Sequence, residues 1–208
     1  MTEFQIHQKL LRDYPELVHD KFPFPKPYVG GDEIKAIVLG ADPTRILKDK
    51  TPQPFNVVFE LDNPKSPYWR GIGKNIRLID GLTEDNLYVQ NLCRNYFTQE
   101  TSKNKKWEAI ARDYWVPFLR KELDELFPQS IPILITTQFI LRACLTSGRP
   151  MKARTIYEEC KAITPQENLL GRKVLALYRH HSYSLERRKD YAGFLGGEIN
   201  SKSQTGKR

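Results

Sequence analysis

The segment that decides the fold is residues 34–44, IKAIVLGADPT, in which an apolar run ends at a glycine and an Asp-Pro turn. Three more short apolar runs follow along the chain, at 87–90 (LYVQ), 131–135 (IPILI) and 174–178 (VLALY). The runs are rich in β-branched or aromatic residues and are mostly apolar on both faces. That pattern is typical of strands covered on both sides of a parallel sheet.

Helical patterns lie between these runs. Apolar residues recur at steps of three and four from Trp107 to Leu126, where Pro117 is expected to introduce a kink. Shorter apolar stripes occur at 72–79 and 139–144, and residues 3–21 also look helical. The alternation predicts an α/β fold, a three-layer α/β/α sandwich around a four-stranded, mostly parallel sheet.

The domain organisation follows from the length of 208 residues. We expect one domain over 1–200, with a helical N-terminal extension at 1–31 and a frayed polar tail at 201–208. Residues 22–31 are rich in proline and glycine and are expected to form an irregular connection. Four prolines in residues 51–67 predict a long structured loop there.

Composition limits the class of protein. Lysine and arginine number 33 against 25 aspartates and glutamates, which gives a net charge of +8. This charge fits a nucleic-acid partner, but it also fits many ordinary basic proteins. No apolar run approaches the roughly 20 residues of a membrane-spanning helix, and the first residues lack a secretion-signal profile. The sequence therefore predicts a cytoplasmic protein, nucleoid-associated if the source is bacterial, with no membrane contact.

The residues that follow the strands are the first candidates for a site, because ligands bind beyond the carboxyl ends of strands in open α/β sheets. Asp42, Asn91 and His180 follow the first, second and fourth runs. Each has an ordinary alternative: Asp-Pro starts turns, asparagine caps turns, and a His-His pair fits a surface loop or a metal site. No other histidine lies near a strand end and no cysteines are paired, so we expect no metal.

Five motifs in this chain resemble those of the uracil-DNA glycosylase superfamily, in the same order. Residues 40–44 (GADPT) resemble its water-activating loop, Gly-Gln-Asp-Pro-Tyr-His in the uracil-specific branch, and 56–59 (NVVF) resemble its base-stacking element. Residues 87–92 (LYVQNL) resemble the strand that ends in the base-recognising asparagine. Residues 107–108 (WE) match a helix start, and 180–184 (HHSYS) resemble the leaving-group loop, His-Pro-Ser-Pro-Leu-Ser.

The resemblance implies a monofunctional DNA glycosylase, which hydrolyses the N-glycosidic bond of uracil or a related damaged base flipped out of DNA. Asp42 would stabilise the cationic sugar and orient the attacking water, and His180 would donate to the departing base. Ala41, Phe59 and Asn91 would bind the base. The DNA contacts would come from one loop and the residues after it, namely Ser182, Ser184, Leu185, Arg187, Arg188 and Lys189. The resemblance implies a DNA partner, a monomer and no cofactor.

The match departs from the family at positions that bear on base choice. Thr44 stands where the uracil-specific branch has a tyrosine that blocks thymine, so the wall of the pocket is smaller. In the last loop Ser184 replaces the leucine that wedges into the base stack, and Leu185 or Tyr183 is left for that role. Some branches hold an iron–sulfur cluster on four cysteines, and the three scattered cysteines here argue against one.

The sequence is also compatible with other functions. The same fold could act as a nucleic-acid- or protein-binding module with little or no glycosylase activity, as the altered Thr44 and last loop suggest. A Rossmann-like nucleotide enzyme is a distant alternative, because no GxGxxG follows the first strand. These residues also have explanations that involve no function. Phe59 fits a core residue, and Trp107 is expected to serve packing. Residues 187–189 fit a solvated helix start.

Overall fold

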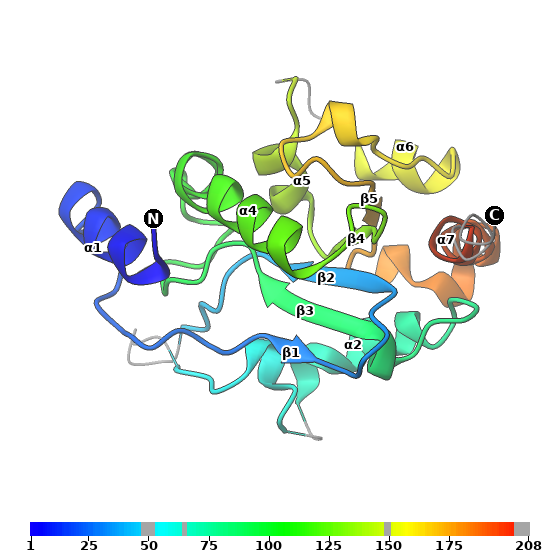
Figure 1. Ribbon diagram of the computed structural model, residues 1–208, viewed down its shortest axis with the longest axis horizontal. Coiled ribbons are helices and arrows are strands. Elements are labelled where there is room, and N and C mark those ends of the chain that lie inside the picture. Colours follow the sequence, from blue (N-terminus) through cyan, green and yellow to red (C-terminus); the bar gives the residue numbers. More distant parts are fainter. Residues whose placement is uncertain (47–52, 64–65, 148–150, 202–208) are drawn as a thin grey trace.

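A computed structural model describes residues 1–46, 53–63, 66–147 and 151–201. Within these residues the protein is a mixed α/β fold built on one five-stranded sheet (Figure 1). The strands are β1 (Tyr28–Val29), β2 (Ala36–Gly40), β3 (Leu87–Asn91), β4 (Ile133–Ile135) and β5 (Val174–Ala176). Their spatial order is β1-β3-β2-β4-β5; β1 pairs antiparallel with β3, and the other pairs are parallel.

The expected number of strands was too low by one. The four apolar runs form β2 to β5, but β1 adds a fifth strand at the edge of the sheet, inside the segment expected to be irregular. A strand of only two residues is too short to show an alternating pattern, and its prolines and glycines pointed to a loop. The mostly parallel character of the sheet is as predicted.

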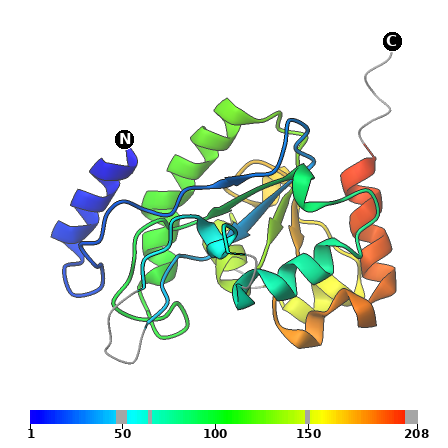
Figure 2. The same ribbon diagram turned by 90° about the horizontal axis from the view of Figure 1, so that it is seen from below.

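The helices are α1 (Glu3–Asp13), α2 (Pro67–Ile76), α3 (Trp107–Ile110), α4 (Val116–Leu126), α5 (Gln138–Cys144), α6 (Ala153–Glu158) and α7 (Lys189–Asn200). Figure 1 shows α4 and α5 on one side of the sheet and α2 on the other, so helices lie over both of its faces. Helices α1 and α7 lie at opposite ends of the molecule in both views (Figures 1 and 2). The protein therefore has an α/β architecture in which the strands are enclosed between helices.

The first helix is shorter than the predicted 3–21. It begins at a capping box, in which Thr2 and Gln5 exchange hydrogen bonds of 2.8 and 3.2 Å, and it ends at Asp13. Pro15 explains the end, because the residue before a proline is disfavoured in helical conformation. The buried side consists of Ile6, His7 and Leu10, and Leu17 is only partly buried beyond the helix.

The predicted kink near Pro117 is a π-helical turn. Residues 111–115 form this turn between α3 and α4, and Pro117 lies in the first turn of α4. Proline has no N–H to donate and its ring crowds the preceding turn of an α-helix. The wider turn just before it accommodates both effects.

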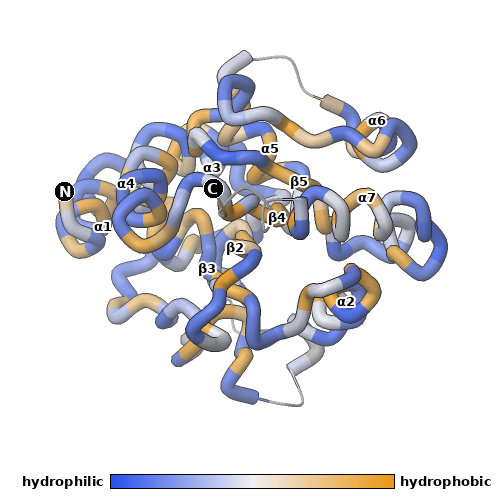
Figure 3. Tube along the Cα trace, turned by 45° about the vertical axis from the view of Figure 1, so that its right-hand side comes forward, coloured by the Kyte–Doolittle hydropathy of each residue, from blue (hydrophilic) through white to orange (hydrophobic). Residues whose placement is uncertain are grey.

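The core is centred on the two middle strands. All five residues of β2 and all five of β3 are buried, as expected for parallel strands covered on both faces. Along the surrounding helices hydrophobic and hydrophilic positions alternate, which is the pattern of helices with one buried side (Figure 3). Among the described residues, no helix is both long and apolar enough to cross a membrane.

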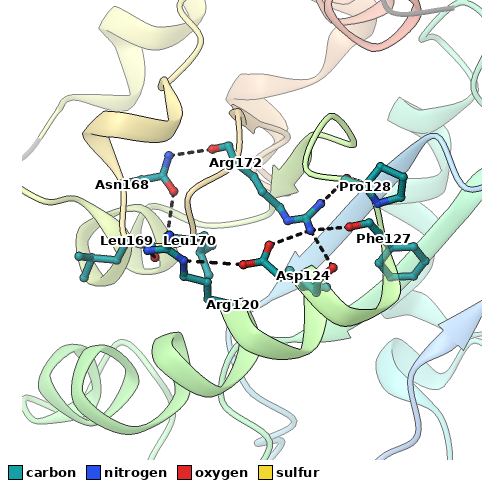
Figure 4. Close-up of polar contacts among 9 residues, drawn as sticks. Arg120, Asp124, Phe127, Pro128, Asn168, Leu169, Leu170 and Arg172 are labelled. Carbon is teal, nitrogen blue, oxygen red and sulfur yellow. Dashed lines mark hydrogen bonds and ion pairs between the residues drawn. The ribbon is translucent and has the colours of Figure 1, made fainter. Parts of the chain in front are cut away.

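A buried arginine joins the end of α4 to the start of β5 (Figure 4). Arg172 is fully buried, and its guanidinium donates to the backbone carbonyls of Leu123 (2.7 Å), Phe127 (2.7 Å) and Pro128 (2.6 Å). It also pairs with Asp124 at 3.0 Å. The carbonyls of Leu123 and Pro128 also accept the backbone N–H groups of Phe127 and Ile131, so Arg172 adds a second donor to each and supplies the donor for the Phe127 carbonyl.

The predicted polar tail is described only at Ser201, which is exposed. Residues 202–208 lie outside the described residues, as do 51–52 and 64–65 of the predicted long loop. The described part of that loop includes a 3₁₀ turn at Val58–Glu60. This turn carries Phe59 to the site described next.

Candidate functional site

A pocket of about 380 Å³ opens at the carboxyl edge of the sheet. Residues at the end of β3 and after β2, β4 and β5 contribute to it, together with two segments far away in sequence. The lining comprises Ala41, Asp42, Pro43, Thr44, Arg45, Phe55, Phe59, Glu60, Asn91, Glu100, Thr101, Ser102, Thr136, Thr137, Phe139 and Arg179. The structure therefore brings together five of the predicted site residues: Ala41, Asp42, Thr44, Phe59 and Asn91.

Hydrogen bonds beyond the strand ends hold these loops against one another. The N–H of Cys93 donates to the carbonyl of Ala41 at 2.9 Å, which ties the loop after β2 to the loop after β3. The Thr136 hydroxyl donates to the carbonyl of Leu39 at 2.8 Å, and the N–H of Arg179 donates to the carbonyl of Thr136 at 3.2 Å. The rim of the pocket is thus a continuation of the sheet and not a set of independent loops.

Asp42 is the carboxylate of this pocket, and three donors hold it. Its Oδ1 accepts the backbone N–H of Thr44 at 2.9 Å. Its Oδ2 accepts the hydroxyl of Thr101 at 2.5 Å and the indole N–H of Trp107 at 2.8 Å. The predicted packing residue Trp107 is buried, and it also binds the candidate catalytic acid.

The protonation of Asp42 reflects two opposing effects. Burial raises the pKa of the carboxyl above its ordinary value, since a charge in a poorly solvated site is disfavoured. The hydrogen bonds from Thr101, Thr44 and Trp107 lower the pKa, because they stabilise the charged form. Burial is the larger effect, so the net pKa is raised. A carboxylate with a raised pKa is a stronger base than a solvated one.

Asn91 faces the pocket from the last position of β3. The side chain is 4% exposed, and no described residue hydrogen bonds to its amide. It lies opposite Gly40 in the parallel ladder of β2 and β3. A Cβ at position 40 would lie 2.3 Å from Asn91 Oδ1 and 2.6 Å from the Phe59 ring, so only glycine leaves room for both side chains.

Phe59 closes one side of the pocket with a strained backbone. Its φ of 56° and ψ of 17° fall in the left-handed region, which non-glycine residues seldom occupy. The hydroxyl of Ser66 donates to the Phe59 carbonyl at 3.0 Å, and the ring lies 6.0 Å from the ring of Trp69. Such strain is typical of positions whose side chain must point in a set direction at a functional site.

Thr44 forms part of the pocket wall, and its rotamer is held. The backbone N–H of Phe97 donates to Thr44 Oγ1 at 2.9 Å, which leaves the methyl group as the free part of the side chain. The pocket wall at this position is consequently small and fixed.

His180 does not line the pocket. The side chain is exposed, its ring lies 4.2 Å from the ring of His181, and its Nδ1 accepts the backbone N–H of Ser182 at 3.3 Å. When Nδ1 accepts, a neutral imidazole carries its proton on Nε2 and can donate there. The adjacent Arg179 lines the pocket and was not among the predicted residues.

The six predicted DNA-contact residues occupy different environments. Ser182, Arg187 and Lys189 are exposed, and Ser184 and Arg188 are partly buried. Arg188 donates to the Ser182 carbonyl at 3.4 Å and lies over the Tyr183 ring at 5.9 Å. Leu185 is only 1% exposed and its N–H donates to Asn75 Oδ1 at 3.1 Å, so it belongs to the core in this structure.

Several pocket residues escaped sequence reasoning. Thr136 and Thr137 follow β4, and the same strand-end rule that found Asp42 and Asn91 would have identified them. Glu100, Thr101 and Ser102 lie in the long connection between β3 and α3, well beyond the end of the strand, and no sequence signal marks them. Arg45 and Glu60 form an ion pair at 3.6 Å in the structure. In the sequence the predicted long loop lies between them.

Comparison with known proteins assigns no family to the chain: no family model matches it, and no curated protein matches its sequence. Within the part of the chain that the structure describes, no group of three or more His, Cys, Asp or Glu side chains is placed to hold a metal ion. What the pocket can do chemically therefore has to follow from its own residues.

Proposed function

We propose that the protein is a monofunctional DNA glycosylase that removes uracil or a related damaged base from DNA, in base-excision repair. The observation that carries the proposal is the convergence of Asp42, Asn91 and Phe59 in one pocket of about 380 Å³. This volume lies within the range of about 300–1,000 Å³ that is common for ligand sites. A fold of the uracil-DNA glycosylase type, and action as a monomer without a cofactor, belong to the same proposal.

Base recognition falls to the unpartnered amide and the aromatic ring. The Asn91 amide offers one acceptor and a pair of donor hydrogens, which complement a base edge that carries both an N–H and a carbonyl. The Phe59 ring provides a face on which a flipped base stacks. Ala41 lies beside them at the rim.

The hydrolysis requires charge stabilisation on both sides of the broken bond. When the bond between C1′ and the base nitrogen breaks, its electron pair leaves with the base and the sugar becomes cationic. The Asp42 carboxylate stabilises that cation and accepts a hydrogen bond from the water that adds to C1′. The water loses a proton as it adds to C1′ and the departing base anion takes one up, so the products are the neutral free base and an abasic site in the DNA.

The departing base needs a donor, and the loop after β5 offers two. His180 Nε2 is the donor that the family resemblance implies, but it reaches the pocket only if the loop shifts when DNA binds. Arg179 already lines the pocket. Exposed Ser182, Arg187 and Lys189 follow on the same chain segment and fit contacts to flanking phosphates.

The test is release of free base from oligonucleotides that carry a single uracil, hypoxanthine, xanthine or mismatched thymine. We expect release from at least one of these substrates, and a fall of about 10²- to 10⁴-fold in Asp42→Asn with DNA affinity retained. Asp62→Asn is the matched control, because Asp62 is exposed and does not line the pocket. Failure of the wild-type protein on all four substrates would overturn the proposal.

One observation favours a second candidate, a binding module without catalysis. The exposed position of His180 leaves the pocket without the imidazole that the resemblance implies. For a binding module we expect damaged or single-stranded DNA to bind with equal affinity to wild type and Asp42→Asn, with no base released by either.

A further inference from the structure

Both donors to Asp42 Oδ2 come from one segment, residues 100–107, which has no role in the mechanism proposed above. Thr101 and Trp107 lie 59 and 65 residues after Asp42 in the sequence. Their hydrogen bonds, of 2.5 and 2.8 Å, end on the same oxygen. A loop that served only packing would have no need to place two polar hydrogens on a carboxylate that faces a pocket.

The two oxygens of Asp42 are left in different states. Each carboxylate oxygen has two lone-pair sites. Oδ2 accepts the Thr101 hydroxyl and the Trp107 indole N–H, whereas Oδ1 accepts the Thr44 N–H, and the Thr44 hydroxyl is a further donor to the carboxylate. Thr101 and Trp107 therefore hold one oxygen of the carboxylate from outside its own loop.

We propose that Thr101 and Trp107 are positioning residues, which hold Oδ2 and thereby fix the direction in which the Asp42 carboxylate faces the reacting sugar and water. This inference deepens the proposed glycosylase function and rests on it for its catalytic consequence. It assigns a task to Trp107 beyond packing, and it gives Thr101 a role that no sequence motif indicated.

The segment from Glu100 to Trp107 is built to keep these donors in place. The backbone N–H of Asn104 donates to the carbonyl of Glu100 at 3.1 Å, and the N–H of Trp107 donates to the carbonyl of Asn104 at 3.1 Å. The Asn104 side chain is buried and accepts the N–H of Lys106 at 3.0 Å. Trp107 is 1% exposed and opens α3, so its indole cannot turn away without disturbing the core.

The donors also favour the charged form of Asp42. An indole N–H can donate but cannot accept, so its bond to Oδ2 is compatible with a carboxylate and opposes a proton on that atom. Each of these hydrogen bonds lowers the pKa of the carboxyl, whereas burial raises it. Loss of either donor is therefore expected to raise the pKa further. A Thr101 that only filled space, without its hydrogen bond to Asp42, would not affect this titration.

The decisive comparison is Thr101→Val against Thr101→Ser, measured as single-turnover base release across pH. Valine keeps the shape and removes the hydroxyl, and serine restores it. We expect Thr101→Val to slow release roughly tenfold at neutral pH, as for one lost bond to a charged group, and to move the acidic limb of the profile to higher pH. DNA affinity stays unchanged, and Thr101→Ser recovers rate and profile.

Thr98→Val is the matched control. The Thr98 hydroxyl donates to the Glu16 carbonyl at 2.9 Å outside the pocket, so its loss removes a similar bond without touching Asp42. A Thr101→Val protein with the wild-type rate and pH profile would overturn the inference. So would equal effects of Thr101→Val and Thr98→Val.

A second measurement keeps this inference separate from the proposed function. Titration of the Asp42 carboxyl carbon by NMR needs no substrate, and we expect a higher pKa in Thr101→Val and in Trp107→Phe than in the wild type. If the wild type releases no base, the proposed function fails while this titration still decides whether the two donors hold the carboxylate. An identical titration in all three proteins rejects the inference.

Discussion

Gly40 shapes the pocket through the side chain that it lacks. Its position in β2 leaves the space in which Asn91 Oδ1 and the Phe59 ring approach each other. The requirement is steric, because a Cβ there would lie 2.3 Å from one and 2.6 Å from the other. In the proposed function, base selection by Asn91 and Phe59 would therefore depend on the space that Gly40 leaves.

Gly40→Ala is expected to impair base release more than folding. Asn91 and Phe59 must move to admit the methyl group, and such overpacking costs about 1–3 kcal/mol. We predict at least a tenfold loss of single-turnover rate, with the same circular dichroism spectrum as the wild type. Gly193→Ala is the control, because a Cβ on Gly193 in α7 meets no atom within 4 Å. A Gly40→Ala protein with full activity would contradict this account of the pocket.

The raised pKa of Asp42 predicts a pH-dependent difference in stability. The folded state holds the Asp42 proton more tightly than the unfolded state, so the wild type gains stability as the pH falls through the raised pKa. An asparagine at position 42 has no such titration. The free energy of unfolding of the wild type, minus that of Asp42→Asn, is therefore expected to increase from pH 7 to pH 4.

Urea unfolding of both proteins at several pH values measures this difference. The other carboxylates of the chain cancel in the subtraction, which isolates position 42. A difference that stays constant, or that decreases on acidification, would show that the Asp42 pKa is not raised in the folded protein.

The loop after β5 contains two candidate donors to the departing base, His180 and Arg179. We predict that His180→Ala slows base release by about 10²-fold if the imidazole donates to the departing base, with DNA affinity little changed. Arg179→Met, assayed beside it under the same conditions, tests the alternative donor that already lines the pocket. If Arg179→Met slows base release and His180→Ala does not, Arg179 is the donor to the departing base.

At the scale of single elements, Arg172 secures the end of α4. Arg172→Met keeps much of the length and apolar volume but removes the bonds to Leu123, Asp124, Phe127 and Pro128, and it leaves the Phe127 carbonyl without this donor. We predict a loss of about 3 kcal/mol in the free energy of unfolding, because several bonds from a charged group are lost and a buried carbonyl is left unpaired. Arg154→Met is the control: its side chain is 78% exposed, and it is expected to lose less than about 0.5 kcal/mol. Equal stabilities would contradict the role assigned to Arg172.

The elements that the sequence predicted well are the ones with strong periodicity. The four buried strands are visible as apolar runs, and the strand-end rule then places Asp42 and Asn91 on one rim. The rule has no access to side chains delivered by loops, so it missed Thr101. It also placed His180 only as far as the strand end, because the direction of its side chain depends on the 3₁₀ turn at His181–Tyr183.

At the scale of the whole molecule, the net charge of +8 predicts salt-dependent DNA binding. Arg187 and Lys189 are exposed beside the loop after β5, whereas Lys9 and Arg12 are exposed on α1 at the opposite end of the molecule (Figures 1 and 2). Replacement of either pair by glutamine removes the same charge. The two double variants therefore distinguish phosphate contacts near the loop after β5 from the general attraction of DNA by the net positive charge of the protein.

We expect Arg187→Gln with Lys189→Gln to weaken DNA binding and to reduce the slope of log affinity against log salt by about 0.9 for each phosphate that is no longer neutralised. The pair on α1 should change the slope little. Fluorescence anisotropy with a labelled duplex between low and physiological salt provides the measurement. Equal slopes for both double variants would mean that DNA does not approach the pocket along this loop.

The buried ion pairs of Arg94 have a practical consequence for handling the protein. Arg94 is 4% exposed, three residues after Asn91, and it pairs with Glu122 on α4 and with Glu3 at the start of α1. An affinity tag that displaced Glu3 would leave Arg94 with Glu122 as its carboxylate partner. The weaker pairing of this buried cation would cost stability beside the strand that ends in Asn91. A protein with such an uncleaved tag is therefore expected to be less stable during an assay of the proposed base release.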